Sequence, residues 1–245
     1  MRVPRVYTDQ ALASDQRLVL QDQSAHYLTR VLRMQPGRSL VIFNGNGGEY
    51  PASIVAVDKK SVTLQLGEQV TVERESPLQI HLAIGISRGE RMDLVLQKAT
   101  ELGVTTITPL FTEQGEVHLT GERLQKKLRH WQQIVISACE QCQRNTLPLL
   151  HTPQKLADWI ATVQEPCRLV LHHRGEAGLS TGQPSPSGAV LLIGPEGGLS
   201  ADEIALALQQ GFKPLTLGPR VMRTETAPLA AISILQFIWG DLGRG

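Results

Sequence analysis

The stretch AVLLIGPEGGLSADEI (residues 189–204) joins a strand pattern to a helix pattern through a glycine-rich turn. Residues 189–193 are all apolar, which is typical of a strand buried on both faces of a sheet. Ser200 is followed three residues later by Glu203, the spacing of a capping box at the start of a helix. A buried strand that leads directly into a helix is the repeating unit of a parallel α/β sheet.

The same alternation of strand and helix patterns extends over the chain from Pro77 to the C-terminus. Further strand patterns cover residues 78–86, 105–111, 168–173 and 214–218. Helix patterns cover residues 90–103 and 124–138, and others begin at Thr152-Pro153, Ser200 and Thr226. We therefore predict an α/β domain over residues 77–245, in which a mostly parallel sheet is flanked by helices.

The segment before Pro77 has a different pattern, of short strands separated by turns. Strand patterns cover residues 39–43, 49–57 and 61–66, and the sequence NGNGG (44–48) suits a turn because Asn and Gly tolerate positive φ angles. Ser24 is suited to cap a short helix, whose apolar face would carry Ala25, Leu28, Val31 and Leu32. We predict a small β-barrel-like domain over residues 1–72, with the domain boundary near residues 73–77.

The composition is that of a folded protein, with 41% hydrophobic and 19% charged residues among 245. No apolar run approaches the roughly 18 residues that a membrane-spanning helix needs, and the N-terminus lacks the apolar core of a signal peptide. Three cysteines do not make a disulfide framework in a chain of this length. We expect a cytoplasmic protein. The net charge of +1 by itself argues neither for nor against a nucleic-acid partner.

Ligands bind at the carboxyl ends of the strands in a parallel α/β sheet, and three such ends carry polar or glycine-rich residues. They are residues 172–174, 194–198 and 218–226. The second contains neither G-x-G-x-x-G nor G-K-[ST], so from spacing alone a ligand-binding loop and an ordinary turn are equally favoured. The third places Arg220, Arg223 and Glu225 between an apolar strand and an apolar helix, which favours a functional site over a solvated edge.

Cys139 and Cys142 form a C-x-x-C motif, which can indicate metal binding or redox chemistry. They lie on one predicted helix, without a second cysteine pair or a histidine at ligand spacing, so a packed helical pair is the favoured interpretation. The seven histidines form no H-E-x-x-H motif or comparable group. We predict no metal site.

The two longest motifs, LLIGPEGGLSADEI (191–204) and LGPRVMRTETA (217–227), together resemble a known family. The pair is similar to the cofactor-binding motifs of the bacterial 16S (small-subunit) ribosomal RNA uridine-N3 methyltransferases, which belong to the SPOUT class. Four other segments fit the resemblance, namely MRVPRVY (1–7), HYLTRVLR (26–33), SRGERMDLVLQKATELGV (87–104) and ACEQCQRNTLP (138–148). Pro228 departs from the family pattern, but proline is well tolerated in the first turn of a helix.

The resemblance implies a PUA-like RNA-binding domain over residues 1–72 and a SPOUT methyltransferase domain over residues 77–245, whose C-terminal segment forms a trefoil knot. It also implies a homodimer, with the apolar helix of residues 229–239 in the interface. The expected activity is transfer of a methyl group from S-adenosylmethionine (SAM) to N3 of a specific uridine in 16S ribosomal RNA. The expected substrate is this RNA within the assembled small ribosomal subunit.

The resemblance further assigns site residues by position in the motifs. Arg223 and Glu225 are expected to be catalytic. The expected SAM-binding residues are His172, Ile193, Gly194, Pro195, Glu196, Gly197, Gly198, Leu217, Gly218, Val221, Met222, Thr226 and Ala227. The expected RNA-binding residues are Arg2, Arg5, Arg30, Arg33, Arg88, Arg91 and Arg144.

Three alternatives remain open from the sequence. The enzyme could methylate a ribose 2′-oxygen, as other SPOUT proteins do, because spacing does not distinguish a base nitrogen from a ribose hydroxyl. The chain could instead bind ribosomal RNA as an assembly factor without catalysis. Within the last loop, Arg223 and Glu225 could pair with each other and have only a structural role.

Overall fold

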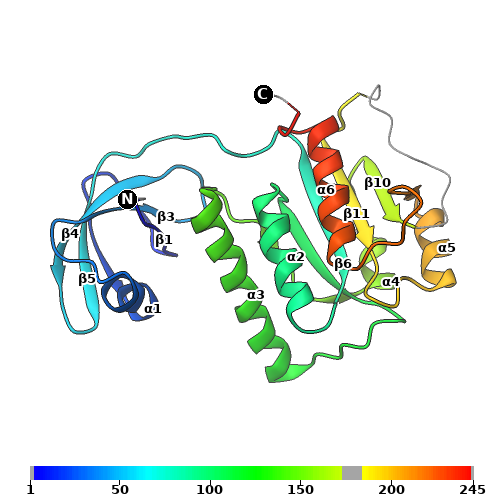
Figure 1. The fold of residues 1–245 in the computed structure, drawn as a ribbon, viewed down its shortest axis with the longest axis horizontal. Helices are drawn as coiled ribbons and strands as arrows, with labels where there is room; N and C mark the ends of the chain where they lie inside the picture. The colour runs from blue at the N-terminus through cyan, green and yellow to red at the C-terminus, as the bar shows by residue number, and fades with distance from the viewer. Residues whose placement is uncertain (1–2, 173–183, 244–245) are drawn as a thin grey trace. The chain divides into compact units, whose positions relative to one another are not determined.

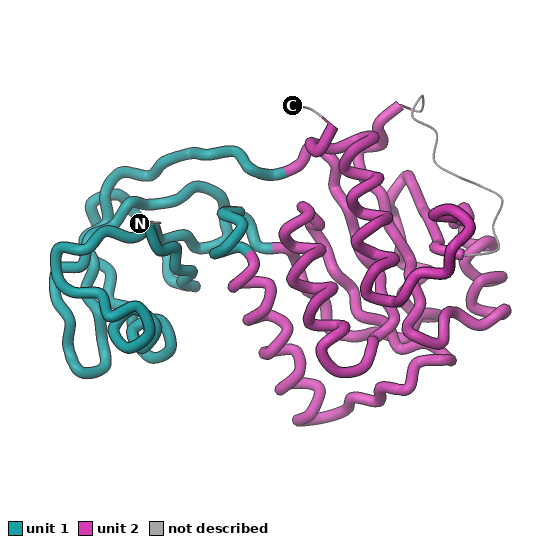
Figure 2. The backbone as a smooth tube through the Cα atoms, in the orientation of Figure 1, with its two compact units in different colours: residues 1–75, 139–147 teal, residues 76–138, 148–245 magenta. Residues whose placement is uncertain are grey.

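The computed structural model describes residues 3–172 and 184–243, which form two compact units. The N-terminal unit consists of residues 1–75 and 139–147, and the second unit consists of residues 76–138 and 148–245 (Figure 2). No helix in the described ranges is both long enough and apolar enough to span a membrane.

The N-terminal unit is built on a five-stranded sheet with the strand order β1-β3-β4-β5-β2. Its strands are β1 (Arg5–Tyr7), β2 (Arg17–Gln21), β3 (Ser39–Phe43), β4 (Tyr50–Val57) and β5 (Ser61–Leu66). β1 pairs with β3 in parallel and the other pairs are antiparallel. Buried and exposed residues alternate along β2 and β4, so one face of the sheet forms the core of this unit, which Leu28 completes.

Residues 139–147 belong to the N-terminal unit although they lie far along the chain. The buried Arg5 guanidinium donates to Glu49 Oε2 and to Asn145 Oδ1, both at 2.6 Å. Glu140 Oε1 accepts a hydrogen bond from the Tyr7 amide at 3.0 Å. The boundaries predicted from the sequence, 1–72 and 77–245, did not include this return of the chain.

The second unit contains a seven-stranded sheet in which every strand pair is parallel. The strand order is β12-β10-β11-β6-β7-β8, with β9 also pairing with β7. The strands are β6 (Gln79–Gly85), β7 (Thr106–Phe111), β8 (Leu149–Leu150), β9 (Gln154–Lys155), β10 (Cys167–Leu171), β11 (Gly188–Ile193) and β12 (Lys213–Leu215). All six residues of β11 are buried, as expected for a central strand covered on both faces.

Helices cover both faces of this sheet, so the unit has three layers (Figure 1). Leu82, Ile84 and Leu191 pack on one side with α2 (Glu90–Glu101), α3 (Gly121–Cys142) and α6 (Thr226–Ile238). Ala83, Val190 and Leu192 pack on the other side with α4 (Leu156–Ile160) and α5 (Ala201–Gln209). The predicted α/β architecture with a parallel sheet and a small N-terminal β domain is confirmed.

Three predicted elements differ in their bounds. The first helix is α1 (Asp22–His26), which begins before Ser24 and continues as a π-helix, η1 (Tyr27–Val31), where Val31 is 61% exposed. α4 begins only at Leu156, because the preceding residues pair with β7 as strand β9. β12 ends at Leu215, and the chain then turns through Gly218, whose φ of 82° is in the left-handed region.

Candidate active site

A pocket of about 800 Å³ lies at the carboxyl ends of β10, β11 and β12. Its walls are the loop between β11 and α5, the loop between β12 and α6, and single residues from other elements, including Arg91, Gln114 and His172. This is the edge where a parallel α/β sheet binds its ligands.

The β11–α5 loop is held by close backbone packing around glycines. A Cβ atom on Gly194 would lie 2.6 Å from the carbonyl carbon of Gly198, which no real side chain tolerates. The Gly198 amide donates to the carbonyl of Pro195 at 2.8 Å and closes the turn. Beyond it, the capping box between Ser200 and Glu203 is present as predicted and fixes the start of α5.

A glycine from a neighbouring strand is also needed. Gly85 ends β6, and a Cβ atom there would lie 2.6 Å from the backbone nitrogen of Pro195. Gly197 has a comparable constraint, since its Cβ atom would lie 3.0 Å from Cβ of Gln114. The glycines therefore allow this loop to pack closely against other protein atoms at several points.

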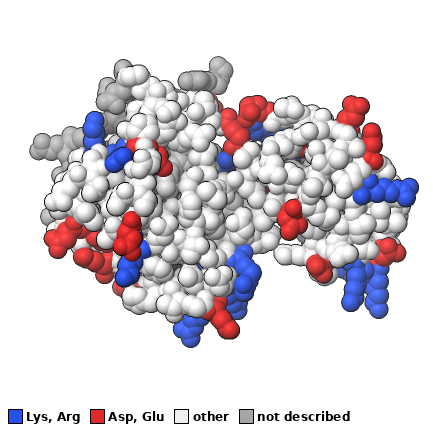
Figure 3. All heavy atoms as spheres, turned by 180° about the vertical axis from the view of Figure 1, so that it is seen from behind, with Lys and Arg blue, Asp and Glu red and all other residues white. Residues whose placement is uncertain are grey.

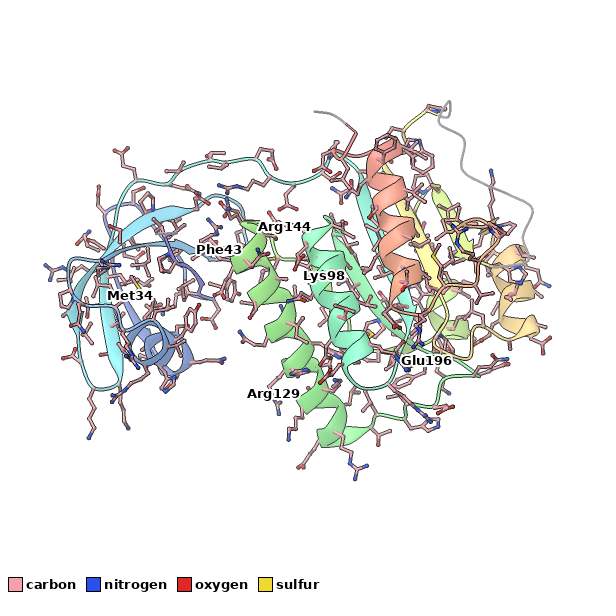
Figure 4. The ribbon with its side chains drawn as sticks, viewed as in Figure 1. Met34, Phe43, Lys98, Arg129, Arg144 and Glu196 are labelled. Carbon is pink, nitrogen blue, oxygen red and sulfur yellow. The ribbon has the colours of Figure 1, made fainter. Side chains whose placement is uncertain are left out.

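Glu196 extends from this loop into an ion pair with α2. Its Oε1 accepts from the Arg88 amide and from Arg91 Nη1, each at 2.9 Å. Partial burial raises the pKa of Glu196, but the hydrogen bonds from Arg88 and Arg91 outweigh it and lower the pKa below its ordinary value. Glu196 lies near the N-terminal end of α6 (Figure 4), so the ion pair connects α2 to the pocket.

The β12–α6 loop is fixed mainly through Thr224. Its hydroxyl donates to the carbonyl of Gly194 at 3.3 Å and lies 3.2 Å from the hydroxyl of Ser87. The Arg223 carbonyl accepts from the amides of Thr226 and Ala227, which begins α6. By contrast, the side chain of Val221 is 80% exposed and those of Arg220 and Arg223 are exposed too.

Glu225 carries an unpartnered polar atom in this pocket. Its Oε2 is buried and accepts no hydrogen bond from any described residue. The nearest cationic atom is Arg91 Nε, at 3.9 Å, which is beyond hydrogen-bond distance. Arg223 and Glu225, both within the described part of the chain, form no ion pair with each other, so the purely structural pairing considered above is absent.

The pocket brings together most of the residues expected to bind SAM. All of them except Thr226 line it, and so do both expected catalytic residues, Arg223 and Glu225. Thr226 is exposed, one residue into α6. Arg2, expected to bind RNA, lies outside the described residues.

The expected RNA-binding arginines fall into different environments. Arg5 and Arg144 are only 8% and 4% exposed, and they pair with Glu49 and Glu75. Burial and pairing give both a structural role in the N-terminal unit, which differs from the predicted contact with phosphates. Arg30 and Arg33 are exposed on that unit, and the exposed Arg88 pairs with Glu116 in the second unit.

The sequence predicted that Arg91 binds RNA, and in the structure this residue lines the pocket, on the first turn of α2. The sequence did contain a signal for this position, because Arg91 follows the buried strand of residues 78–86 and thus lies near another carboxyl end of the sheet. Gly85 and Gln114 were also missed. Their importance depends on contacts with Pro195 and Gly197, which no local pattern encodes.

The C-x-x-C pair is located in the part of α3 that belongs to the N-terminal unit. Cys139 is buried, and its hydrogen bond with Cys142 together with burial raises the pKa of the Cys139 thiol. Among the described residues, no cluster of three or more His, Cys, Asp or Glu side chains could hold a metal ion.

A three-layer parallel sheet with a glycine-lined pocket at its carboxyl edge defines an α/β protein that binds a small ligand there. The family model described as an RNA methyltransferase domain matches residues 74–236. A second model, described as an RNA methyltransferase PUA domain, matches residues 20–67. The class is therefore that of RNA methyltransferases with a PUA domain.

Individual relatives narrow this class. The ribosomal RNA small subunit methyltransferase E of Buchnera aphidicola (Acyrthosiphon pisum strain) is 36% identical over 98% of this chain and 95% of its own. The enzyme of the same name from Neisseria gonorrhoeae, solved with bound SAM, is 37% identical with a TM-score of 0.91 and covers 98% of this chain and 100% of its own. A Legionella pneumophila protein, also solved with SAM, is 44% identical with a TM-score of 0.95 over 99% and 100%. The chain belongs to the ribosomal RNA small subunit methyltransferase E family.

Proposed function

We propose that this protein transfers the methyl group of SAM to N3 of a uridine in 16S ribosomal RNA. The observation that carries the proposal is the buried, unpartnered Oε2 of Glu225, in a pocket whose other loop is a glycine cradle. Support for the cofactor comes from the relatives solved with SAM, and support for the substrate comes from their names.

The residues present fit SAM as a ligand. Residues 193–198 line the pocket, and a Cβ atom on Gly198 would meet no protein atom within 4 Å, so the backbone there is open to a ligand. The apolar side chains of Leu217, Met222 and Ala227 line the same cavity and suit the adenosine. When bound, SAM supplies a methyl group that its sulfonium already activates.

The reaction also requires that a proton be removed from N3 of the uridine. N3 of uridine carries a proton at neutral pH, so this proton must leave for N3 to bond to the methyl carbon; the bond from that carbon to the sulfonium sulfur would break, leaving a neutral thioether. Glu225 Oε2 has an unused acceptor site with which to take this proton. Arg223 lies two residues away in the same pocket and can stabilise the negative charge that develops on the uracil oxygens.

The experiment is nucleoside mass spectrometry on small ribosomal subunits incubated with the purified protein and SAM. The subunits come from cells that lack this protein, so that the target uridine is unmodified. We expect N3-methyluridine at one position. Production of 2′-O-methyluridine would instead support ribose methylation, and RNA binding without any methylated nucleoside would support an assembly factor.

The proposal includes the cellular form of the enzyme, namely a cytoplasmic homodimer with a trefoil knot that acts on the assembled small subunit. The dimer has support on α6, where Ile234 and Phe237 are 37% and 64% exposed. Intrachain packing already covers Ile232, Leu235 and Trp239, so only this narrower surface remains for a partner. Light scattering at micromolar concentration tests the dimer, and an active monomer would exclude it.

A further inference from the structure

We infer that the exposed face of α3 in the second unit is a binding surface for the phosphate backbone of the substrate RNA. This inference rests on the proposed function, because it names a second place where the same RNA is held. The surface is defined by Arg123, Lys126, Arg129 and His130, and it is called the α3 basic face below.

The α3 basic face is a consequence of helical spacing. Leu128, Trp131 and Val135 mark the side of the helix that packs toward the sheet and α2, with Trp131 fully buried. Residues three and four apart share a side of a helix, so Arg123, Lys126 and Arg129 lie on the exposed side of α3, and His130 lies at its border with α2. All four basic residues are exposed, and Figure 4 shows Arg129 on the side of α3 turned away from α2.

The charge of this segment is opposite to that of the remaining chain. Residues 121–138 contain four lysines and arginines and one acid, Glu122, which gives a net charge of +3. Because the whole chain carries +1, all other residues together carry −2. Blue side chains gather at the lower edge of the molecule in Figure 3, where the N-terminal end of α3 lies in Figure 1.

These cations are available to a ligand. Arg123, Lys126 and Arg129 form no ion pair with any residue in the described ranges. Two other basic side chains contact α2: Lys127 Nζ lies 3.1 Å from Asp93 Oδ1, and His130 Nε2 lies 2.7 Å from Asp93 Oδ2. These contacts tie α3 to α2. The surface is thus rigid and its three free cations point to solvent.

The position also suits an RNA that enters the pocket. Arg91 of the pocket wall lies two residues before Asp93, the anchor of α3. Gln114 of the opposite wall lies in the segment that leads into α3. From Arg123 to Arg129 the helix rises about 9 Å. The three cations along this length can contact up to three phosphates of an RNA strand.

The test compares two triple variants of the full-length protein with the same change in net charge. The first replaces Arg123, Lys126 and Arg129 with glutamine. The matched control replaces Lys98, Lys155 and Lys213, which lie in the second unit outside α3, with glutamine. The measurement is the dissociation constant for transcribed 16S ribosomal RNA between about 50 and 200 mM salt.

We expect the α3 variant to bind RNA at least tenfold more weakly at the low-salt end. Its plot of log affinity against log salt should be less steep by about two to three, because each lost phosphate contact removes about 0.7–0.9. Glu122→Gln should strengthen binding, since it removes the one acid on the face. SAM affinity should be unchanged in every variant, which shows that the pocket is intact.

A wild-type salt slope in the α3 variant would overturn the inference, and so would an equal loss of slope in the control. The outcome is separable from the proposed function, because binding is measured without methyl transfer. The wild-type protein could fail to transfer a methyl group while the α3 variant still bound RNA more weakly than wild type. The proposed function would then be wrong, and the α3 basic face would still be an RNA-binding surface. A lost slope combined with unchanged KM for RNA would show that this binding is unrelated to the reaction.

Discussion

The two loops that form the pocket differ in how completely their polar groups are satisfied. In the β11–α5 loop, Glu196 accepts two hydrogen bonds, and Gly194 and Gly198 pack too closely for any side chain. In the β12–α6 loop, Arg223 is exposed and Glu225 Oε2 is buried without a hydrogen-bond partner. Glu196 in the first loop is satisfied by donors from Arg88 and Arg91, while Glu225 Oε2 in the second has no hydrogen-bond donor among the described residues.

This difference indicates that one loop is suited to proton transfer and the other to cofactor binding. Glu225 Oε2 is buried without a hydrogen-bond donor, so one acceptor site of this carboxyl group is unused in the pocket. Such a group is preorganised for a proton or donor that arrives with the substrate. The β11–α5 loop, which is rigid before any ligand binds, is suited to hold the cofactor.

The largest effect is expected from Glu225→Gln, which removes the acceptor and keeps the shape. If Glu225 takes the N3 proton, single-turnover methyl transfer should slow by about 10² or more, with SAM affinity nearly unchanged. Glu196→Gln is the matched change in the other loop and should weaken SAM binding more than it slows transfer. If the two variants behaved alike, the division of work between the loops would be wrong.

A second prediction concerns the backbone packing under the β11–α5 loop. Gly85→Ala places a Cβ atom against the backbone of Pro195, so the loop must move, at a cost of about 1–3 kcal/mol in unfolding free energy. We expect SAM affinity to fall about tenfold, a difference of about 1.4 kcal/mol. The control is Gly188→Ala in β11, where the nearest atom to the new Cβ lies 3.6 Å away. Calorimetry with both variants measures the difference.

Arg91 is the cation between the two loops, and its removal should have a smaller effect. Its side chain is 43% exposed, so the ion pair with Glu196 contributes about 1 kcal/mol or less. Arg91→Gln should therefore raise the KM for SAM by about fivefold or less, which is the same free energy expressed as a ratio. Arg91→Lys should restore part of it, because a lysine keeps the charge but loses the planar guanidinium. An unchanged KM in the glutamine variant would show that the ion pair does not position the loop.

The smallest effect on methyl transfer is expected from a pair outside both loops. His81 Nδ1 lies 2.6 Å from Glu165 Oε1, and this hydrogen bond lowers the pKa of Glu165 from 4.5 to about 2. A carboxyl group whose pKa is lowered by folding stabilises the fold fully at any pH above its pKa in the unfolded chain. This stabilisation should therefore be lost as the pH falls from about 4.5 to about 2.

Thermal unfolding across this range tests the pair, with Glu165→Gln as the variant that should abolish this part of the pH dependence. Near neutral pH the variant and the wild type should differ in stability by a constant amount. Methyl-transfer rates measured above pH 5 should then report on the pocket loops and not on acid unfolding. A Glu165→Gln protein with the same acid transition as wild type would contradict the assignment.

The sequence predicted most of the second unit, because its elements are encoded locally. The apolar run of residues 189–193 and the Ser200–Glu203 spacing produced β11 and α5 where they were expected. The short strands β8 and β9 were missed, since two residues leave no periodicity to detect. The π-helix η1 was also missed, because its pattern is close to that of an α-helix.

The candidate site was predictable where a motif carried it and not where a long-range contact did. The residues of the two loops were identified from the motifs and lie around one pocket. Gly85 was not, because its constraint comes from Pro195, which is distant in the sequence. Likewise, the sequence predicted that Arg5 and Arg144 contact RNA, because nothing local indicates that they bond to Asn145 and Glu75.

The return of residues 139–147 to the N-terminal unit has a consequence for how the protein is made. During synthesis the first 75 residues emerge from the ribosome without the amide of Asn145 that Arg5 binds and without the guanidinium of Arg144 that pairs with Glu75. This unit therefore cannot complete its folding until residues 76–138, which include only β6 and β7 of the α/β sheet, have also been translated. For the same reason, it cannot be exchanged between proteins as a contiguous cassette, since cutting the gene after codon 75 leaves part of the module behind.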